Sequence, residues 1–283
     1  MTSLWAFLQL SRPHFLIGGA LMYAVGASLA GDLDIGTYLL GQAMVSAAQL
    51  TAHFVNEYAD VEVDRHIANR TMFSGGSGVL TQGRLSAGVA LRAATVTSTV
   101  AIALIVAVGG ISSGAAFIGV AALAVSWGYS MPPVRLLNTG WGEVATSIVV
   151  GALVPATGAL VNGGGISVDL AWVAAVFTLL NFATVLAFEL PDLESDRTAG
   201  KTVLAVRIGG RRAKRALAAI YGAAAIVGVA ATVSGSVDLT SSLVAGSVPA
   251  GLTIIAANRD RYALLTTAAV ASVAVTAIAY LAS

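Results

Sequence analysis

Long apolar runs constrain this chain more than any other feature of its sequence. Nine segments approach 20 residues, about the length that a helix needs to cross a hydrocarbon core of about 30 Å. They are residues 14–31, 37–56, 87–108, 111–130, 141–161, 168–188, 214–234, 239–257 and 262–281. Hydrophobic residues make up 57% of the chain and charged residues only 10%, whereas about a quarter of a typical soluble domain is charged. We therefore expect a membrane protein.

The apolar runs are predicted to be helices. A backbone in lipid must satisfy its own hydrogen bonds, and these segments lack the alternating polar and apolar residues of a membrane β-strand. Small residues in the first run, such as Gly18 and Gly26, allow neighbouring helices to approach closely. The predicted fold class is all-α: a single domain over residues 1–283, with nine transmembrane helices in a bundle.

The distribution of positive charge predicts the orientation of this bundle. If the N-terminus is cytoplasmic, the connections on the far side are residues 31–36, 109–110, 162–167 and 235–238, and none contains Lys or Arg. All 15 basic residues then lie on or next to the cytoplasmic side, in agreement with the positive-inside rule. We expect an integral, multi-pass membrane protein with a cytoplasmic N-terminus. A nucleic-acid binder is excluded, because no polar domain carries a basic face.

An acidic motif occurs twice in the chain. The first copy reads NEYADVEVDR over residues 56–65, and the second reads FELPDLESDR over residues 188–197. Their aspartates match at a constant offset of 132 residues, which pairs Asp60 with Asp192 and Asp64 with Asp196. Four predicted helices separate the copies, so both lie at cytoplasmic ends of helices that run in the same direction. This arrangement favours a parallel repeat.

Each copy of the motif places two carboxylates on one face of a helix. Residues four apart differ by about 40° of rotation and lie one turn apart. Asn56 extends the first row by another turn, whereas Glu62 and Glu194 point elsewhere. Glu189 joins the second row only if the helix continues through Pro191, and proline removes a backbone donor there.

The two rows have the chemistry of a magnesium and diphosphate site. Carboxylate and amide oxygens suit Mg²⁺, which keeps several waters and bridges carboxylates to phosphates. Two facing rows would hold two ions with a diphosphate between them, in a polar cavity that faces the cytoplasm. Arg65, Arg70, Arg197 and Lys201 follow the rows and can donate to phosphate oxygens. A single aspartate pair is explained equally well by ordinary hydrated residues at a helix end. Two matching pairs beside long apolar helices favour a functional site.

Two other features of the sequence carry less weight. The segment FSGGSGVL, residues 73–80, weakly resembles a phosphate-binding glycine loop but lacks the lysine of a nucleotide P-loop. A flexible loop is an equally good interpretation. His14, His53 and His66 are poor candidates for metal ligands, because the expected ion prefers oxygen.

Three motifs together carry a resemblance to a known family. NEYADVEVD is similar to an N-x-x-x-D-x-x-x-D motif, DLESDRTAGKTVLAVRIG to a second D-x-x-x-D motif with its following segment, and YSMPPVRL followed by GWGE to a central loop. These are motifs of the UbiA superfamily of intramembrane prenyltransferases, which the chain resembles over nearly its whole length. The resemblance implies that two Mg²⁺ ions lie between the diphosphate of a polyprenyl donor and a set of ligands: Asn56, Asp60, Asp64, Asp192 and Asp196.

The same resemblance implies the reaction. The isoprenoid chain would be transferred within the lipid bilayer to a lipophilic or aromatic acceptor, a quinone precursor, with release of diphosphate. The four aspartates Asp60, Asp64, Asp192 and Asp196 would be catalytic. Substrate contacts would come from Asn56, Arg65, Arg70, Tyr129, Arg135, Arg197 and Lys201.

The identity of the acceptor stays open. The segments YSMPP, GWGE and AGKTVLAVRIGG resemble the branch that prenylates dihydroxynaphthoate on the way to menaquinone. Glu57 stands where an aspartate is common, and FELPD replaces an asparagine-rich segment. A terpene cyclase of the same superfamily, in which the cation is captured by its own chain, is one alternative. A transporter is another, although transporter sites usually lie near the midplane and not at helix ends.

Overall fold

In a computed structural model, which describes residues 3–65, 67 and 69–283, the chain forms a bundle of helices. The described residues include no strand, so the all-α prediction is confirmed. The long helices are α2 (Leu16–Ala27), α3 (Ile35–Asp64), α4 (Ala87–Gly109), α5 (Ser113–Gly128), α8 (Val168–Glu189), α11 (Gly210–Val233), α12 (Thr240–Asn258) and α13 (Tyr262–Ala282). Another continuous helical stretch combines α6 (Gly142–Ile148), the π-helical turn η3 (Val149–Leu153) and α7 (Val154–Val161).

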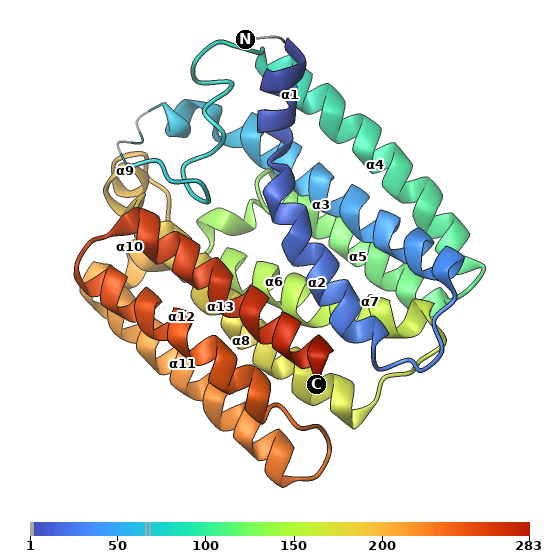
Figure 1. Cartoon of the computed structure of the whole chain (residues 1–283). Helices are drawn as coiled ribbons and strands as arrows, with labels where there is room; N and C mark the ends of the chain where they lie inside the picture. The colour runs from blue at the N-terminus through green and yellow to red at the C-terminus, as the bar shows by residue number, and fades with distance from the viewer. Residues whose placement is uncertain (1–2, 66, 68) are drawn as a thin grey trace.

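Short elements complete the chain. They are α1 (Ser3–Ser11), η1 (Pro13–Phe15), η2 (Leu136–Asn138), α9 (Leu193–Thr198) and α10 (Leu204–Ile208). Figure 1 shows α3, α4 and α5 on one side of the bundle and α11, α12 and α13 on the other. Helices α2, α7 and α8 connect the two sides, because α2 packs against α7 and α13, and α8 packs against α11 and α13.

Six helical stretches are long and apolar enough to cross a membrane. They are Ala87–Gly109, Gly142–Val161, Val168–Glu189, Gly210–Val233, Thr240–Asn258 and Tyr262–Ala282. Their outer surfaces are apolar as well: Val106, Phe117 on the neighbouring α5, and Val233 expose 73%, 75% and 81% of their surface. Apolar exposure of this extent is typical of a surface that faces lipid. The membrane assignment thus rests on the outside of the bundle as well as on its composition.

Local sequence signals explain where several helices begin. The Asp34 carboxylate accepts a hydrogen bond from the Thr37 amide at 2.8 Å, and the Ser167 hydroxyl accepts one from the Leu170 amide at 3.0 Å. Each side chain satisfies one of the amides that a helix N-terminus leaves without a partner. The wider turn of η3 ends two residues before Pro155, which cannot donate to the preceding helical turn.

Small residues set the distances between the central helices. A Cβ atom on Gly26 would lie 1.8 Å from the Pro155 carbonyl oxygen, and one on Gly158 would lie 2.2 Å from the Tyr23 carbonyl oxygen. Both contacts join α2 to α7, whose backbones touch where side chains are absent. The predicted role of Gly26 in close helix approach is confirmed. A Cβ on Gly18 would meet no described residue within 4 Å, so that glycine does not mediate a close approach between described helices.

The contact between α2 and α7 provides a test of this packing. Gly158→Ala should lower the free energy of unfolding by about 1–3 kcal/mol, because the added methyl must displace backbone. The matched control is Gly222→Ala on α11, where an added Cβ meets nothing within 4 Å; there the substitution should be neutral or should stabilise by about 0.5–1 kcal/mol. Thermal unfolding of both variants in detergent measures the difference. Equal melting temperatures would contradict the packing.

Candidate active site

The first acidic row lies on the last turns of α3. The helix continues through Asp64, so Asn56, Asp60 and Asp64 follow one another at successive turns. Both aspartates are buried. The Asn56 Nδ2 atom donates to Asp60 Oδ2 at 3.0 Å and to Ser130 Oγ at 3.2 Å, which holds the row against the segment after α5. Glu62 points away and exposes 72% of its side chain, as expected.

The second acidic row follows a break in the chain. Helix α8 ends at Glu189, and the turn through Pro191 places Asp192 directly before α9. The Asp196 amide donates to the Asp192 carbonyl at 2.8 Å, so the two residues are one helical turn apart. The helix therefore does not continue through Pro191, whose missing amide cannot extend it. Glu189 does not join the row: its Oε2 accepts a hydrogen bond from the Ala205 amide at 2.9 Å.

Lys201 joins the two rows. Its Nζ atom lies 3.0 Å from Asp60 Oδ2 on α3 and 3.5 Å from Asp196 Oδ1 on α9. Lys201 is itself buried, with 9% of its surface exposed. Two motifs that are 132 residues apart in the sequence therefore meet at one end of the bundle, where α9 lies in Figure 1.

Burial makes this cluster unusual electrostatically. Burial raises the pKa of Asp192 to about 7, and the neighbouring carboxylates of Asp196 and Asp64 act in the same direction. The pKa of Asp196 is also raised by burial, although the Lys201 ammonium opposes this effect. For Lys201, burial disfavours the ammonium, but the carboxylates of Asp60 and Asp196 outweigh it and raise the pKa. The cluster holds more negative than positive charge and favours additional cations.

The oxygen atoms of the cluster fit Mg²⁺. Asp60 Oδ1 and Asp192 Oδ1 are both buried and have no hydrogen-bond partner among the residues that the structure describes. Within the described part of the chain, no three acidic or histidine side chains form a ready-made metal cage. Mg²⁺ does not need one, since it usually takes one or two carboxylates and completes its shell with water and substrate phosphate. The two unpartnered oxygens, one from each row, are suitable donors.

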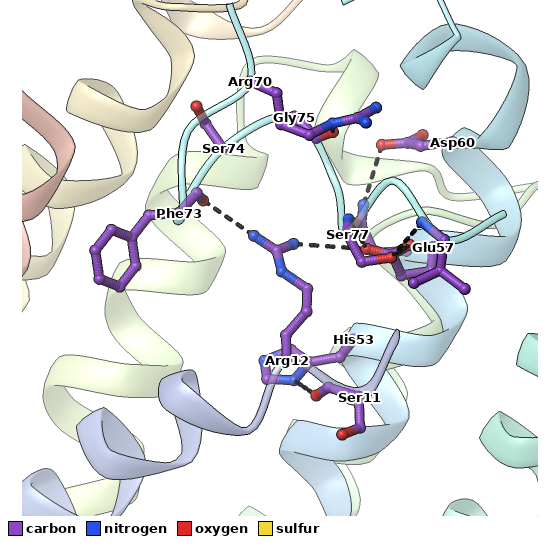
Figure 2. Close-up of polar contacts among 12 residues, drawn as sticks. Ser11, Arg12, His53, Glu57, Asp60, Arg70, Phe73, Ser74, Gly75 and Ser77 are labelled. Atoms are coloured by element: carbon purple, nitrogen blue, oxygen red, sulfur yellow. Dashed lines mark hydrogen bonds and ion pairs between the residues drawn. The ribbon is translucent and has the colours of Figure 1, made fainter. Parts of the chain in front are cut away.

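The glycine loop of residues 73–80 folds against the first row. Figure 2 shows it beside Glu57, whose two carboxylate oxygens accept hydrogen bonds from the Ser77 amide at 2.6 Å and the Ser77 hydroxyl at 2.7 Å. The Arg70 guanidinium donates to the Gly75 carbonyl at 2.6 Å and to the Asp64 carbonyl at 3.1 Å. The loop is thus fixed by side chains, and it does not have the form of a nucleotide P-loop.

The central loop after α5 lies beside both rows. Tyr129 is half-buried, and its ring lies close to Gly142 at the start of α6. Its hydroxyl interacts electrostatically with the carboxylates of Glu189, Glu143, Asp60 and Asp196. Glu143 is almost fully buried, and its Oε1 accepts a hydrogen bond from the Leu204 amide at 2.7 Å.

Several predicted site residues lie outside this cluster. Arg65 pairs with Glu62 at 2.7 Å and Arg197 pairs with Glu194 at 3.4 Å; both arginines are more than half exposed. These are local pairs three residues apart on helix ends, and local partners are easily reached. Arg135 is half-buried in a left-handed backbone conformation, and its Nε atom has no hydrogen-bond partner in the described part of the chain. Among the histidines, the His53 Nδ1 atom lies 3.1 Å from the Ser11 carbonyl oxygen, and His66 lies outside the described residues.

Sequence reasoning missed some residues that the structure places near the rows. Ser130 binds Asn56, and the buried acids Glu57 and Glu143 hold backbone amides. The signal was available for Glu143, because an acid at the start of an apolar run is rare without a function. No sequence signal connected Glu57 to Ser77, because the two residues are 20 positions apart and helical periodicity does not relate them.

Comparison with known proteins places this geometry in context. The profile of the UbiA prenyltransferase family matches residues 15–274. A 1,4-dihydroxy-2-naphthoate octaprenyltransferase from Bacillus subtilis (strain 168) is 26% identical over 245 residues, covering 85% of this chain and 78% of that protein. A UbiA homolog from Aeropyrum pernix K1, solved in its apo form, is 19% identical, with a TM-score of 0.75 and coverage of 94% of this chain and 96% of that one. A UbiA homolog from Archaeoglobus fulgidus bound to GPP and Mg²⁺ is 16% identical, with a TM-score of 0.70 and coverage of 98% and 97%.

The raised pKa of Asp192 predicts how stability depends on pH without ligands. Between its ordinary value of 3.8 and about 7, the folded state binds more protons than the unfolded state, so stability falls as the pH rises. Between pH 5.5 and pH 8, this carboxyl should lower the free energy of unfolding by about 2 kcal/mol. The decrease is about 1.4 kcal/mol for each pH unit up to the folded-state pKa. Melting temperatures in detergent with EDTA measure it. Asp192→Asn should reduce the change of melting temperature with pH. An unchanged pH dependence in this variant would contradict the raised pKa of Asp192.

Proposed function

The chain belongs to the UbiA prenyltransferase family and is therefore a prenyltransferase, and we propose that it transfers an isoprenoid chain from a polyprenyl diphosphate to an aromatic quinone precursor within the membrane. The observation that carries this proposal is the contact of Lys201 with Asp60 and Asp196, which unites the two acidic rows. Membership in this family also decides against a transporter.

The acidic rows are proposed to hold the metal. Asn56, Asp60, Asp64, Asp192 and Asp196 would bind two Mg²⁺ ions, and the unpartnered Oδ1 atoms of Asp60 and Asp192 support this assignment. The metal would supply positive charge to the departing diphosphate. The Archaeoglobus fulgidus homolog bound to GPP and Mg²⁺ supports a diphosphate donor and this metal.

Basic side chains are proposed to bind the donor. Lys201 lies at the centre of the cluster, and its ammonium can donate to a phosphate oxygen as well as to the two carboxylates. Arg70 lies beside Asp64 with its guanidinium on the loop. Arg65 and Arg197 could contact the diphosphate only after leaving their exposed pairs with glutamate. Such pairs contribute little stability, so their loss costs little.

The central loop is proposed to contact the organic part of the substrates. Loss of diphosphate leaves an allylic cation, which the face of an aromatic ring can stabilise. Tyr129 lies near both rows and is the proposed ring, and Arg135 in the same loop is a proposed substrate contact. Similarity to a naphthoate octaprenyltransferase supports an aromatic acceptor of the dihydroxynaphthoate type.

The proposal also includes how the chain crosses the membrane. We take residues 1–283 as one domain in which nine helices cross the bilayer: the six long apolar stretches, α5, and the α2 and α3 helices. The site and the N-terminus would face the cytoplasm. The absence of Lys and Arg from the four opposite connections supports this orientation.

Substitution of one aspartate in each row tests the catalytic assignment. Asp60→Asn and Asp192→Asn should each reduce Mg²⁺-dependent diphosphate release by about 10²-fold or more, because each weakens the binding of a metal ion whose positive charge would stabilise the departing diphosphate. The matched controls are Glu62→Gln and Glu194→Gln, which alter exposed acids of the same motifs and should retain release. Release is measured in detergent with a polyprenyl diphosphate and a naphthoate acceptor. Unchanged release in both aspartate variants would refute the assignment.

A comparison of products with and without acceptor separates transfer from cyclisation. With a long-chain donor and 1,4-dihydroxy-2-naphthoate, we expect a prenylated naphthoate by mass spectrometry. Without acceptor we expect no cyclic hydrocarbon. A hydrocarbon formed in the absence of acceptor would support the terpene cyclase alternative, and a panel of other aromatic and lipophilic acceptors would correct the acceptor class.

A further inference from the structure

Arg12 occupies an elbow that directs its side chain into the protein. It connects α1 to η1 with a φ angle of 50°, in the left-handed region that non-glycine residues rarely adopt. The elbow is held against α3 on both sides: His53 Nδ1 lies 3.1 Å from the Ser11 carbonyl oxygen, and Gln49 Nε2 donates to the Phe15 carbonyl at 2.7 Å. A strained residue fixed in this way indicates that the position of its side chain matters.

The buried guanidinium of Arg12 reaches the glycine loop. Its side chain is only 12% exposed. One terminal nitrogen donates to the Phe73 carbonyl at 3.1 Å, the other lies 4.0 Å from Glu57 Oε1, and the group lies 4.5 Å from the centre of the Phe15 ring. Figure 2 shows Arg12 between Phe73 and Glu57. A segment that precedes the first long helix thus touches the loop 61 residues later.

Glu57 fixes the other end of the same loop. It accepts both the amide and the hydroxyl of Ser77, while Arg12 holds Phe73 and Arg70 holds Gly75. Residues 73–77 are therefore anchored at alternate positions by three charged side chains. Because Glu57 is also the partner of the Arg12 charge, the two anchors depend on each other.

The position of this loop determines the space around Asp64. A Cβ atom on Gly76 would lie 1.9 Å from Asp64 Oδ2, and the glycine has a φ angle of 68°. The loop backbone thus lies directly against a carboxylate of the first row. Movement of residues 73–77 would open this carboxylate to water.

We propose that Arg12 and Glu57 are positioning residues that form a latch, holding residues 73–77 closed against the first acidic row. The closed loop keeps water from the site while the donor loses its diphosphate. The chemical purpose of the latch rests on the proposed function, whereas the latch itself is a property of the fold. Neither Arg12 nor Glu57 is assigned a contact with the reacting atoms.

Thiol labelling tests the latch without any assay of activity. The chain has no cysteine, so Ser74→Cys introduces a single thiol at a buried position of the loop. Added to this variant, Arg12→Gln or Glu57→Gln should each accelerate reaction with a water-soluble maleimide by about tenfold, through more frequent local opening. Arg92→Gln, which alters an exposed arginine on α4, is the matched control and should leave the rate unchanged.

The double variant distinguishes a latch from general loss of stability. If Arg12 and Glu57 act through one latch, Arg12→Gln with Glu57→Gln should label no faster than the faster single variant. Monodisperse elution and a cooperative melting curve establish that each variant is folded. The latch would be overturned if both folded variants, with Arg12→Gln or Glu57→Gln added, were labelled at the same rate as Ser74→Cys alone. It would also be overturned if the two accelerations added together in the double variant.

A second measurement tests the purpose of the latch. With a polyprenyl diphosphate and acceptor, opening should increase the ratio of free prenyl alcohol to prenylated acceptor about tenfold, since water then competes for the cation. Arg12→Lys keeps the charge but not the planar fork, and should give an intermediate ratio. An unchanged ratio despite faster labelling would overturn the positioning role. Failure of the wild-type protein to transfer a prenyl group would refute the proposed function, while labelling would still test the latch.

Discussion

The ammonium of Lys201 is the interaction on which the organisation of the site depends. It lies between Asp60 and Asp196, and thereby connects α3 with the segment that follows α8. The two rows contain four buried aspartates, of which this one ammonium contacts two. Excess buried negative charge is unfavourable unless cations compensate it. The fold therefore concentrates negative charge at one end of an apolar bundle, and Mg²⁺ ions would compensate it.

A second set of acids keeps Lys201 in place. Glu143 at the start of α6 accepts a hydrogen bond from the Leu204 amide, and Glu189 at the end of α8 accepts one from the Ala205 amide. These amides belong to the first turn of α10, which begins three residues after Lys201 and leaves donors without partners within the helix. Both helices are held in turn by the bundle. The position of one ammonium thus depends on how α6 and α8 pack against each other in the bundle.

The helix geometry within each motif could be predicted from the sequence. The ion pairs that its charged residues form could be predicted only in part. The spacing of Asp60 and Asp64 predicted one helical face, because helix geometry relates residues four apart. Pro191 signalled a possible break, and α8 ends before it. Arg65 and Arg197 were predicted to bind substrate, yet in the structure each pairs with a glutamate three residues away. Sequence spacing allowed both outcomes, and the local partner needs no chain closure.

The sequence by itself determined that the chain is helical and built for a membrane, since apolar length and backbone hydrogen bonding leave few other structures. It also determined the chemistry available, two rows of carboxylates followed by basic side chains. The tertiary structure alone decided which of these groups meet: Lys201 between the rows, and Arg12 with Glu57 on the glycine loop. Helical periodicity relates residues a few positions apart, whereas contacts over 61 or 141 residues depend on how whole helices pack.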